Sequence, residues 1–116
     1  MANINTVLGP MESSKLGFTL SHEHICNGFG GSPFTFPEFL DREATLERAV
    51  TDLSEAKSEG LQTIMDVAPH DQGRDIKLQR EVSKRSGVNI LTCTGTWLDV
   101  PRFFQGLDPN KIADLY

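Results

Sequence analysis

The chain has 116 residues, of which 38% are hydrophobic and 23% charged, and its net charge is −5 at pH 7. This length predicts one domain or part of one, and the lack of a basic run excludes nucleic acid as an expected partner. No apolar stretch approaches the roughly 20 residues of a membrane span, and residues 1–20 lack a signal-peptide pattern, so no membrane partner is expected and the cytoplasm is the expected compartment.

The first elements along the chain are two short strands. The stretches "INTVLGP" (4–10) and "GFTLSHEH" (17–24) read as strands, and the polar stretch "MESSKL" (11–16) predicts the turn that joins them. Residues 28–37 contain three glycines and two prolines. They predict a loop without a regular element.

A long amphipathic helix is expected from Asp41. Asp41 suits the N-cap, and Gly60 suits the position just after the last turn. Charged side chains such as Glu47 and Asp52 take one face. The apolar residues of the other face follow helical spacing and predict contact with an apolar layer; they are Leu46, Ala49, Val50, Leu53 and Ala56.

Two buried strands with a helix between them come next. The runs "LQTIMDVA" (61–68) and "VNILTCTG" (88–95) are short and rich in β-branched residues. A helix is expected from about Asp75 to Ser86, with Gly87 as its end. Cys93, inside the second run, is interpreted as a small buried core residue.

The order strand, helix, strand, helix, strand predicts a parallel α/β sheet. Asp108 and Pro109 predict the start of a further helix, and no signal for its end precedes Tyr116. The sequence is therefore interpreted as the N-terminal part of a larger fold. The alternative is a small doubly wound domain that is complete at this length.

The stretch "FTLSHEHICNG" (18–28) carries the main candidate site. Side chains alternate along a strand, so His22 and His24 are expected to point to the same side, where both imidazoles could bind one zinc ion. Two hydrogen-bonded histidines at a strand end are the alternative. Cys26 would join this face only if the strand continued, and the glycine-rich loop argues against that.

Four separated motifs resemble the phosphotriesterase family, which belongs to the amidohydrolase superfamily of metal-dependent TIM barrels. In chain order they are "INTVLGP", "GFTLSHEHI", "TIMDVAPHDQGRD" and "TCTGTWLDVP". The resemblance implies that residues 1–116 are the N-terminal fragment of a single barrel domain. It implies the first three or so strands of a TIM (β/α)8 barrel with their helices, preceded by a short N-terminal β-hairpin.

The same resemblance implies a site with two metals, zinc or another divalent cation. His22 and His24 would bind the more buried one, whereas the family's carboxylated lysine, two further histidines and aspartate match nothing in this sequence. His70 falls in a loop where the family has no ligand and is interpreted as a loop residue. Asp66 is interpreted as a hydrogen-bonding scaffold residue, and Asp75 as a helix cap.

Three further residues match positions that line the family's substrate pocket. Trp97 stands where phosphotriesterases present an aromatic wall and lactonases usually have tyrosine, although it could also be a packing residue beneath a loop. Leu98 and Gln72 match neighbouring positions. Gln72 is polar where organophosphate hydrolases tend to be apolar, which is a departure from an optimised organophosphate site.

The expected function is a zinc-dependent hydrolase of a small-molecule ester, of the phosphotriester or lactone type. In this chemistry divalent cations lower the pKa of water and polarise the oxygen under attack. The resemblance further implies a homodimer for the full-length protein. The alternative is a truncated, catalytically inactive product with weak metal binding or none.

Overall fold

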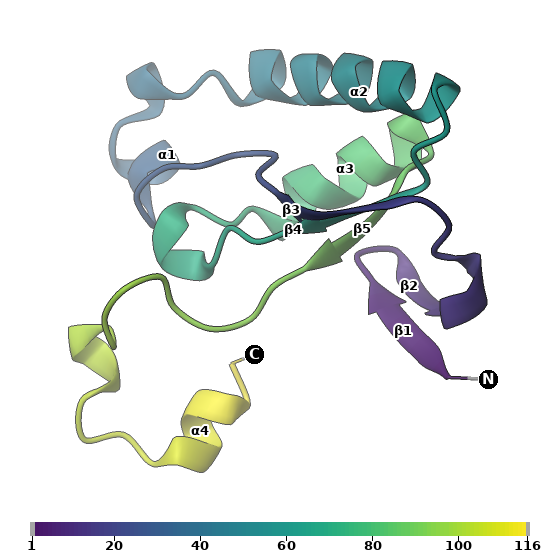
Figure 1. Ribbon diagram of the computed structural model, residues 1–116. Coiled ribbons are helices and arrows are strands. Elements are labelled where there is room, and N and C mark those ends of the chain that lie inside the picture. The colour runs from purple at the N-terminus through teal and green to yellow at the C-terminus, as the bar shows by residue number, and fades with distance from the viewer. Residues whose placement is uncertain (1, 116) are drawn as a thin grey trace.

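The structure, a computed structural model, describes residues 2–115. Its centre is a parallel sheet of three strands, β3 (Thr19–Glu23), β4 (Thr63–Asp66) and β5 (Asn89–Thr92), with β4 in the middle. The helices that join these strands lie on one face of the sheet (Figure 1). This arrangement confirms the predicted parallel α/β fold and is consistent with part of a TIM barrel.

The two crossover helices, α2 (Arg42–Ser58) and α3 (Ile76–Ser86), begin at the predicted caps. The carboxylate of Asp41 accepts a hydrogen bond from the Ala44 N–H at 3.0 Å, and Asp75 caps α3 in the same way. Aspartate at an N-cap satisfies an N–H group that the first helical turn leaves without a partner. Both predictions are therefore confirmed.

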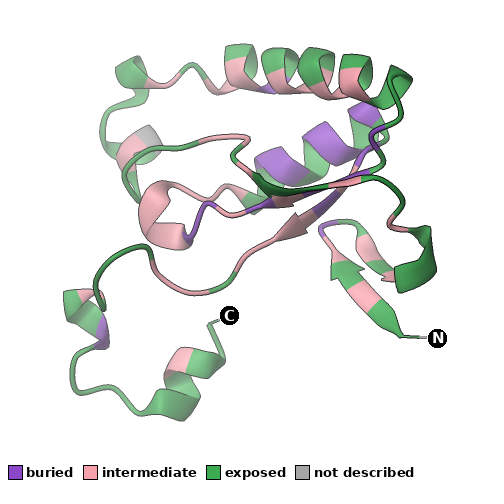
Figure 2. Ribbon diagram, viewed as in Figure 1, coloured by how far each residue is buried: buried purple, intermediate pink, exposed green. Residues whose placement is uncertain are grey.

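The hydrophobic core lies between the sheet and these helices, and Figure 2 shows buried residues concentrated on α3 and the strands. The predicted apolar stripe of α2 faces this core: Leu46 is buried, and the other four positions are partly buried against it. Its buried members are Val7, Leu46, Leu61, Ile64, Leu78, Val82, Val88 and Ile90.

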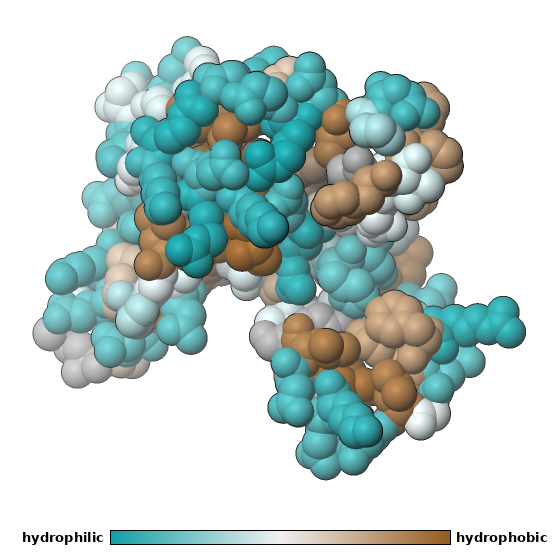
Figure 3. Space-filling model, turned by 180° about the vertical axis from the view of Figure 1, so that it is seen from behind, coloured by the Kyte–Doolittle hydropathy of each residue, from teal (hydrophilic) through white to brown (hydrophobic). Residues whose placement is uncertain are grey.

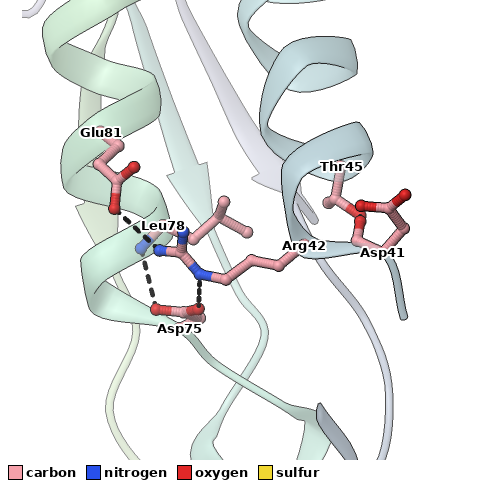
Figure 4. Close-up of polar contacts among 6 residues, drawn as sticks. All are labelled: Asp41, Arg42, Thr45, Asp75, Leu78 and Glu81. Atoms are coloured by element: carbon pink, nitrogen blue, oxygen red, sulfur yellow. Dashed lines mark hydrogen bonds and ion pairs between the residues drawn. The ribbon is translucent and has the colours of Figure 1, made fainter. Parts of the chain in front are cut away.

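A charged cluster joins the start of α2 to α3 (Figure 4). The guanidinium of Arg42 donates to Asp75 at 3.1 Å and to Glu81 at 2.9 Å. One turn further along α2, Glu47 accepts two hydrogen bonds from Arg85 of α3. Asp75 therefore caps its own helix and also fixes the neighbouring one beside it.

The prediction that residues 4–10 form a single strand is wrong. Two strands, β1 (Asn3–Thr6) and β2 (Gly9–Glu12), pair antiparallel around a tight turn within that stretch. The turn forms because Thr6 Oγ1 donates to the Gly9 carbonyl at 2.8 Å and accepts from the Leu8 N–H at 3.2 Å. The next strand, β3, pairs with β4 and not with this hairpin.

The prediction that residues 28–37 contain no regular element is also wrong. A single helical turn, α1 (Ser32–Thr35), is followed by a 3-10 turn (Pro37–Phe39). Glycine at position 31, with φ of +81°, stands at the N-cap, and proline suits the first helical turn. Composition predicts a loop here, but the positions of these residues allow a short helix.

The segment after β5 extends away from the sheet (Figure 1). It ends in α4 (Pro109–Ala113), which Asp108 caps as predicted by accepting from the Asn110 N–H at 2.9 Å. Figure 3 shows apolar side chains on the surface of this segment, in which Phe103 and Leu115 are exposed. None of the helices within residues 2–115 has the length and apolar character that crossing a membrane requires.

Candidate metal centre

A cavity of about 320 Å³ opens at the carboxyl ends of the parallel strands. The loops after β3, β4 and β5 each contribute side chains to its lining. Four predicted site residues meet there, namely His22, His24, Gln72 and Trp97, although they are spread over 76 positions of the sequence. The carboxyl ends of strands are the usual place for sites in α/β folds.

His22 and His24 lie side by side at the end of β3. Their ring centroids are 5.4 Å apart and the ring planes cross at 71°. Two imidazoles on one tetrahedral zinc, at Zn–N distances of about 2.0–2.1 Å, have centroids about 5 Å apart. Both side chains are exposed to solvent from the cavity side. The pair therefore fits two positions of a zinc site.

Within residues 2–115, no group of three or more histidine, cysteine, aspartate or glutamate side chains is placed to hold a metal ion. Cys26 is not beside the histidines, because β3 ends at Glu23, and it instead lines a separate apolar cavity with Phe29 and Phe36. Burial raises the pKa of the Cys26 thiol above its usual value. The two histidine nitrogens are thus fewer than the four ligands that a zinc centre usually has.

His70 lies apart from the histidine pair, in the 3-10 turn His70–Gln72 after β4. Its ring contacts Phe103 and Phe104 edge-on, with centroids 6.1 Å and 5.8 Å away. It lines a different cavity, together with Phe29 and Pro101. This placement agrees with its interpretation as a loop residue.

Cys93 corrects a further prediction, because it is only partly buried and is not part of the core. β5 ends at Thr92, so residue 93 stands at the carboxyl edge and lines the cavity with the histidines. Burial raises the pKa of its thiol. The group therefore remains protonated at neutral pH and is a poor nucleophile.

Trp97 and Leu98 differ in their relation to the cavity. Trp97 forms part of its wall although 61% of the residue is exposed. Leu98 is 72% exposed and lies outside the lining of the 320 Å³ cavity. The tryptophan is not packed beneath a loop, so its position depends on how the backbone of its loop is held.

Asp66 ties the strand ends together at the carboxyl edge of the sheet. It is 1% exposed, and its carboxylate accepts from the Ile25 N–H at 3.1 Å and from the Ala68 N–H at 2.9 Å. Its carbonyl accepts from the Cys93 N–H at 3.0 Å. One buried residue at the end of β4 therefore fixes the segments that follow β3 and β5, which agrees with its scaffold interpretation.

Two residues of the loop after β4, Asp71 and Arg74, were not predicted from the sequence. Asp71 accepts from the Trp97 N–H, and Arg74 donates to the Cys93 carbonyl at 2.6 Å. Their partners lie on another loop, and no short-range pattern marks such pairs. Cys93 could have been found, because it lies near the carboxyl end of a predicted buried strand, where site residues gather.

The comparisons with known proteins agree with these observations. The model of the phosphotriesterase family matches residues 2–113. A protein named aryldialkylphosphatase from Saccharolobus solfataricus is 32% identical over 91% of this chain and 34% of its own length. A phosphotriesterase homology protein from Mycobacterium tuberculosis is 33% identical over 98% of this chain and 36% of its own.

A more distant relative carries a different name. A phospho-furanose lactonase from Mycoplasmopsis agalactiae is 29% identical over 79% of this chain and 26% of its own length. The chain thus spans about a third of the length of the first two relatives. Since the family model covers nearly every residue, the chain belongs to the phosphotriesterase family.

Proposed function

We propose that this chain is part of a zinc-dependent hydrolase of small esters, of the phosphotriester or lactone type. The observation that carries the proposal is the pair His22 and His24, at zinc-compatible spacing, in a cavity that Trp97 also lines. The names of two relatives, an aryldialkylphosphatase and a phospho-furanose lactonase, support the two substrate types.

The predicted site residues have these roles in the proposal. The neutral imidazoles of His22 and His24 hold a divalent cation, which when bound makes water more acidic and polarises the ester oxygen. The indole of Trp97 contacts an apolar leaving group. Gln72 presents an amide that can donate to or accept from a substrate oxygen. Leu98, which lies outside the cavity lining, is assigned to substrate binding only because it matches a pocket position of the family.

In the proposal, residues other than these supply the remaining metal ligands. The chain's match to about a third of the length of its relatives supports a longer barrel domain, in which β3, β4 and β5 would be the first three strands. A second metal, a homodimer and a cytoplasmic location belong to the same proposal. A product that holds only part of the site and does not catalyse is the alternative, favoured by the two-ligand count.

To test the proposal, the gene that encodes this sequence is expressed and the resulting protein is purified. We expect it to bind zinc and to hydrolyse diethyl p-nitrophenyl phosphate or a γ-lactone. A chelator should abolish both properties, and added zinc should restore them. The measurements are zinc by mass spectrometry and initial rates with both esters.

Two other outcomes are informative. Zinc binding without hydrolysis of either ester would favour the inactive alternative. A protein that binds no zinc and hydrolyses neither ester would refute the proposed function altogether.

Replacing Trp97 with alanine is expected to change substrate range and to leave zinc content unchanged. Loss of one aromatic contact, worth about 1–1.5 kcal/mol, should lower kcat/KM for the aryl phosphotriester about tenfold relative to the lactone. Parallel kinetics on both esters, with zinc analysis of the same samples, measure this. If zinc is lost as well, Trp97 is a structural residue and the pocket assignment fails.

A further inference from the structure

The loop after β4 carries a carboxylate that contacts the aromatic wall of the cavity. Asp71 accepts from the backbone N–H of Trp97 at both carboxylate oxygens, each 3.1 Å from the nitrogen. The two residues are 26 positions apart in the sequence. A hydrogen bond to an ionised acceptor is roughly twice as strong as a neutral one.

The turn that carries Asp71 is itself held firmly against the β3 loop. The N–H groups of Gly28 and Gly30 donate to the carbonyls of Gln72 and Asp71, at 2.9 Å and 3.2 Å. A Cβ atom at Gly30 would lie 2.9 Å from the His70 carbonyl oxygen, which is closer than side chains normally approach. The backbone of Asp71 is therefore anchored independently of Trp97.

The loop on the other side of this contact has few restraints of its own. Trp97 is 61% exposed, so side-chain packing contributes little to its position. Gly95, two residues earlier, adopts φ of +96°, a conformation that glycine permits and other residues rarely adopt. Arg74 holds the start of the loop at the Cys93 carbonyl, and Asp71 holds it four residues later at Trp97.

We propose that Asp71 is the positioning residue for the aromatic wall: it fixes the backbone of Trp97 and thereby sets where the indole lies in the cavity. The inference rests on the proposed function, in which Trp97 contacts the leaving group. Asp71 itself is absent from the lining of the histidine cavity and acts only through Trp97.

The first test needs no catalysis, because amide hydrogen exchange of Trp97, followed by NMR, reports on the hydrogen bond directly. In Asp71→Ala we expect exchange about tenfold faster, which corresponds to about 1.4 kcal/mol. Asp71→Asn, which keeps a neutral acceptor, should fall between this variant and the parent. Asp99→Ala is the matched control, since Asp99 is exposed and stands two positions from Trp97.

Unchanged Trp97 exchange in both Asp71 variants would overturn the inference. If Asp71→Ala does not fold, Asp71→Asn decides alone, because replacing an ionised acceptor by a neutral one should still speed exchange measurably.

The second test separates positioning from a merely structural role. In the active protein, Asp71→Asn should lower kcat/KM for the aryl phosphotriester relative to the lactone, mainly through KM, with zinc content unchanged. In a Trp97→Ala background the same substitution should have no further effect on this ratio. An equal effect in both backgrounds would overturn the inference.

The two proposals fail in distinguishable ways. If the parent protein hydrolyses neither ester, the proposed function fails, while amide exchange still decides whether Asp71 holds Trp97.

Discussion

His22→Ala and His24→Ala should each weaken zinc binding by at least about 30-fold, or roughly 2 kcal/mol. The two imidazoles face one cavity with centroids 5.4 Å apart, and no third metal-binding side chain joins them within residues 2–115. In the proposed centre, loss of either nitrogen therefore removes one of the two ligands assigned to this chain. Competition with a chromophoric chelator measures the zinc affinity of each variant.

The chain offers a matched control, because it has only three histidines. His70 lies against Phe103 and Phe104 and lines another cavity, so His70→Ala should leave zinc affinity within about twofold of the parent. The double variant His22→Ala/His24→Ala should be scarcely weaker than either single variant, since two ligands of one ion act as a unit. Zinc affinity retained in both single variants but lost in His70→Ala would contradict the assignment.

The parts of the fold that the sequence predicted depend on local rules. Asp41 and Asp75 cap their helices through N–H groups three residues away, and Gly87 ends α3 with a positive φ. The helix at Ser32–Thr35 was missed because glycine and proline content predicts a loop, whereas a single turn needs only a suitable residue at each position. The turn after Thr6 depends on one hydroxyl, which composition does not reveal.

Within the candidate site, some contacts could not be predicted because they join residues that lie far apart in the sequence. The predicted strand spacing brings His22 and His24 together although β3 ends at Glu23, and the family resemblance supplied Trp97 and Gln72. The bond from Ile25 to Asp66 joins residues 41 apart, and the bond from Trp97 to Asp71 joins residues 26 apart. Such pairs form only when parallel strands bring their carboxyl ends to one edge, so they require the fold.

Asp66→Ala should destabilise the chain by about 3 kcal/mol, because two N–H groups lose an ionised acceptor and one of them, on Ala68, is fully buried. This corresponds to a fall in Tm of roughly 10–15 °C for a chain of this size. Asp66→Asn retains one acceptor oxygen and should lose about half as much. Urea unfolding followed by circular dichroism measures both variants.

Asp52→Ala is the matched control, since Asp52 lies exposed on α2 and pairs with Arg48, a contact worth about 0.5 kcal/mol or less. Because Asp66 holds the residue that follows His24, its loss should also weaken zinc binding, by about 10- to 100-fold, as for other groups that orient metal ligands. An Asp66→Ala chain that unfolds at the parent's urea concentration and binds zinc equally well would show that the strand ends are fixed without it. The histidine pair would then owe its geometry to β3 alone, whose pairing with β4 is irregular between Leu20 and Glu23.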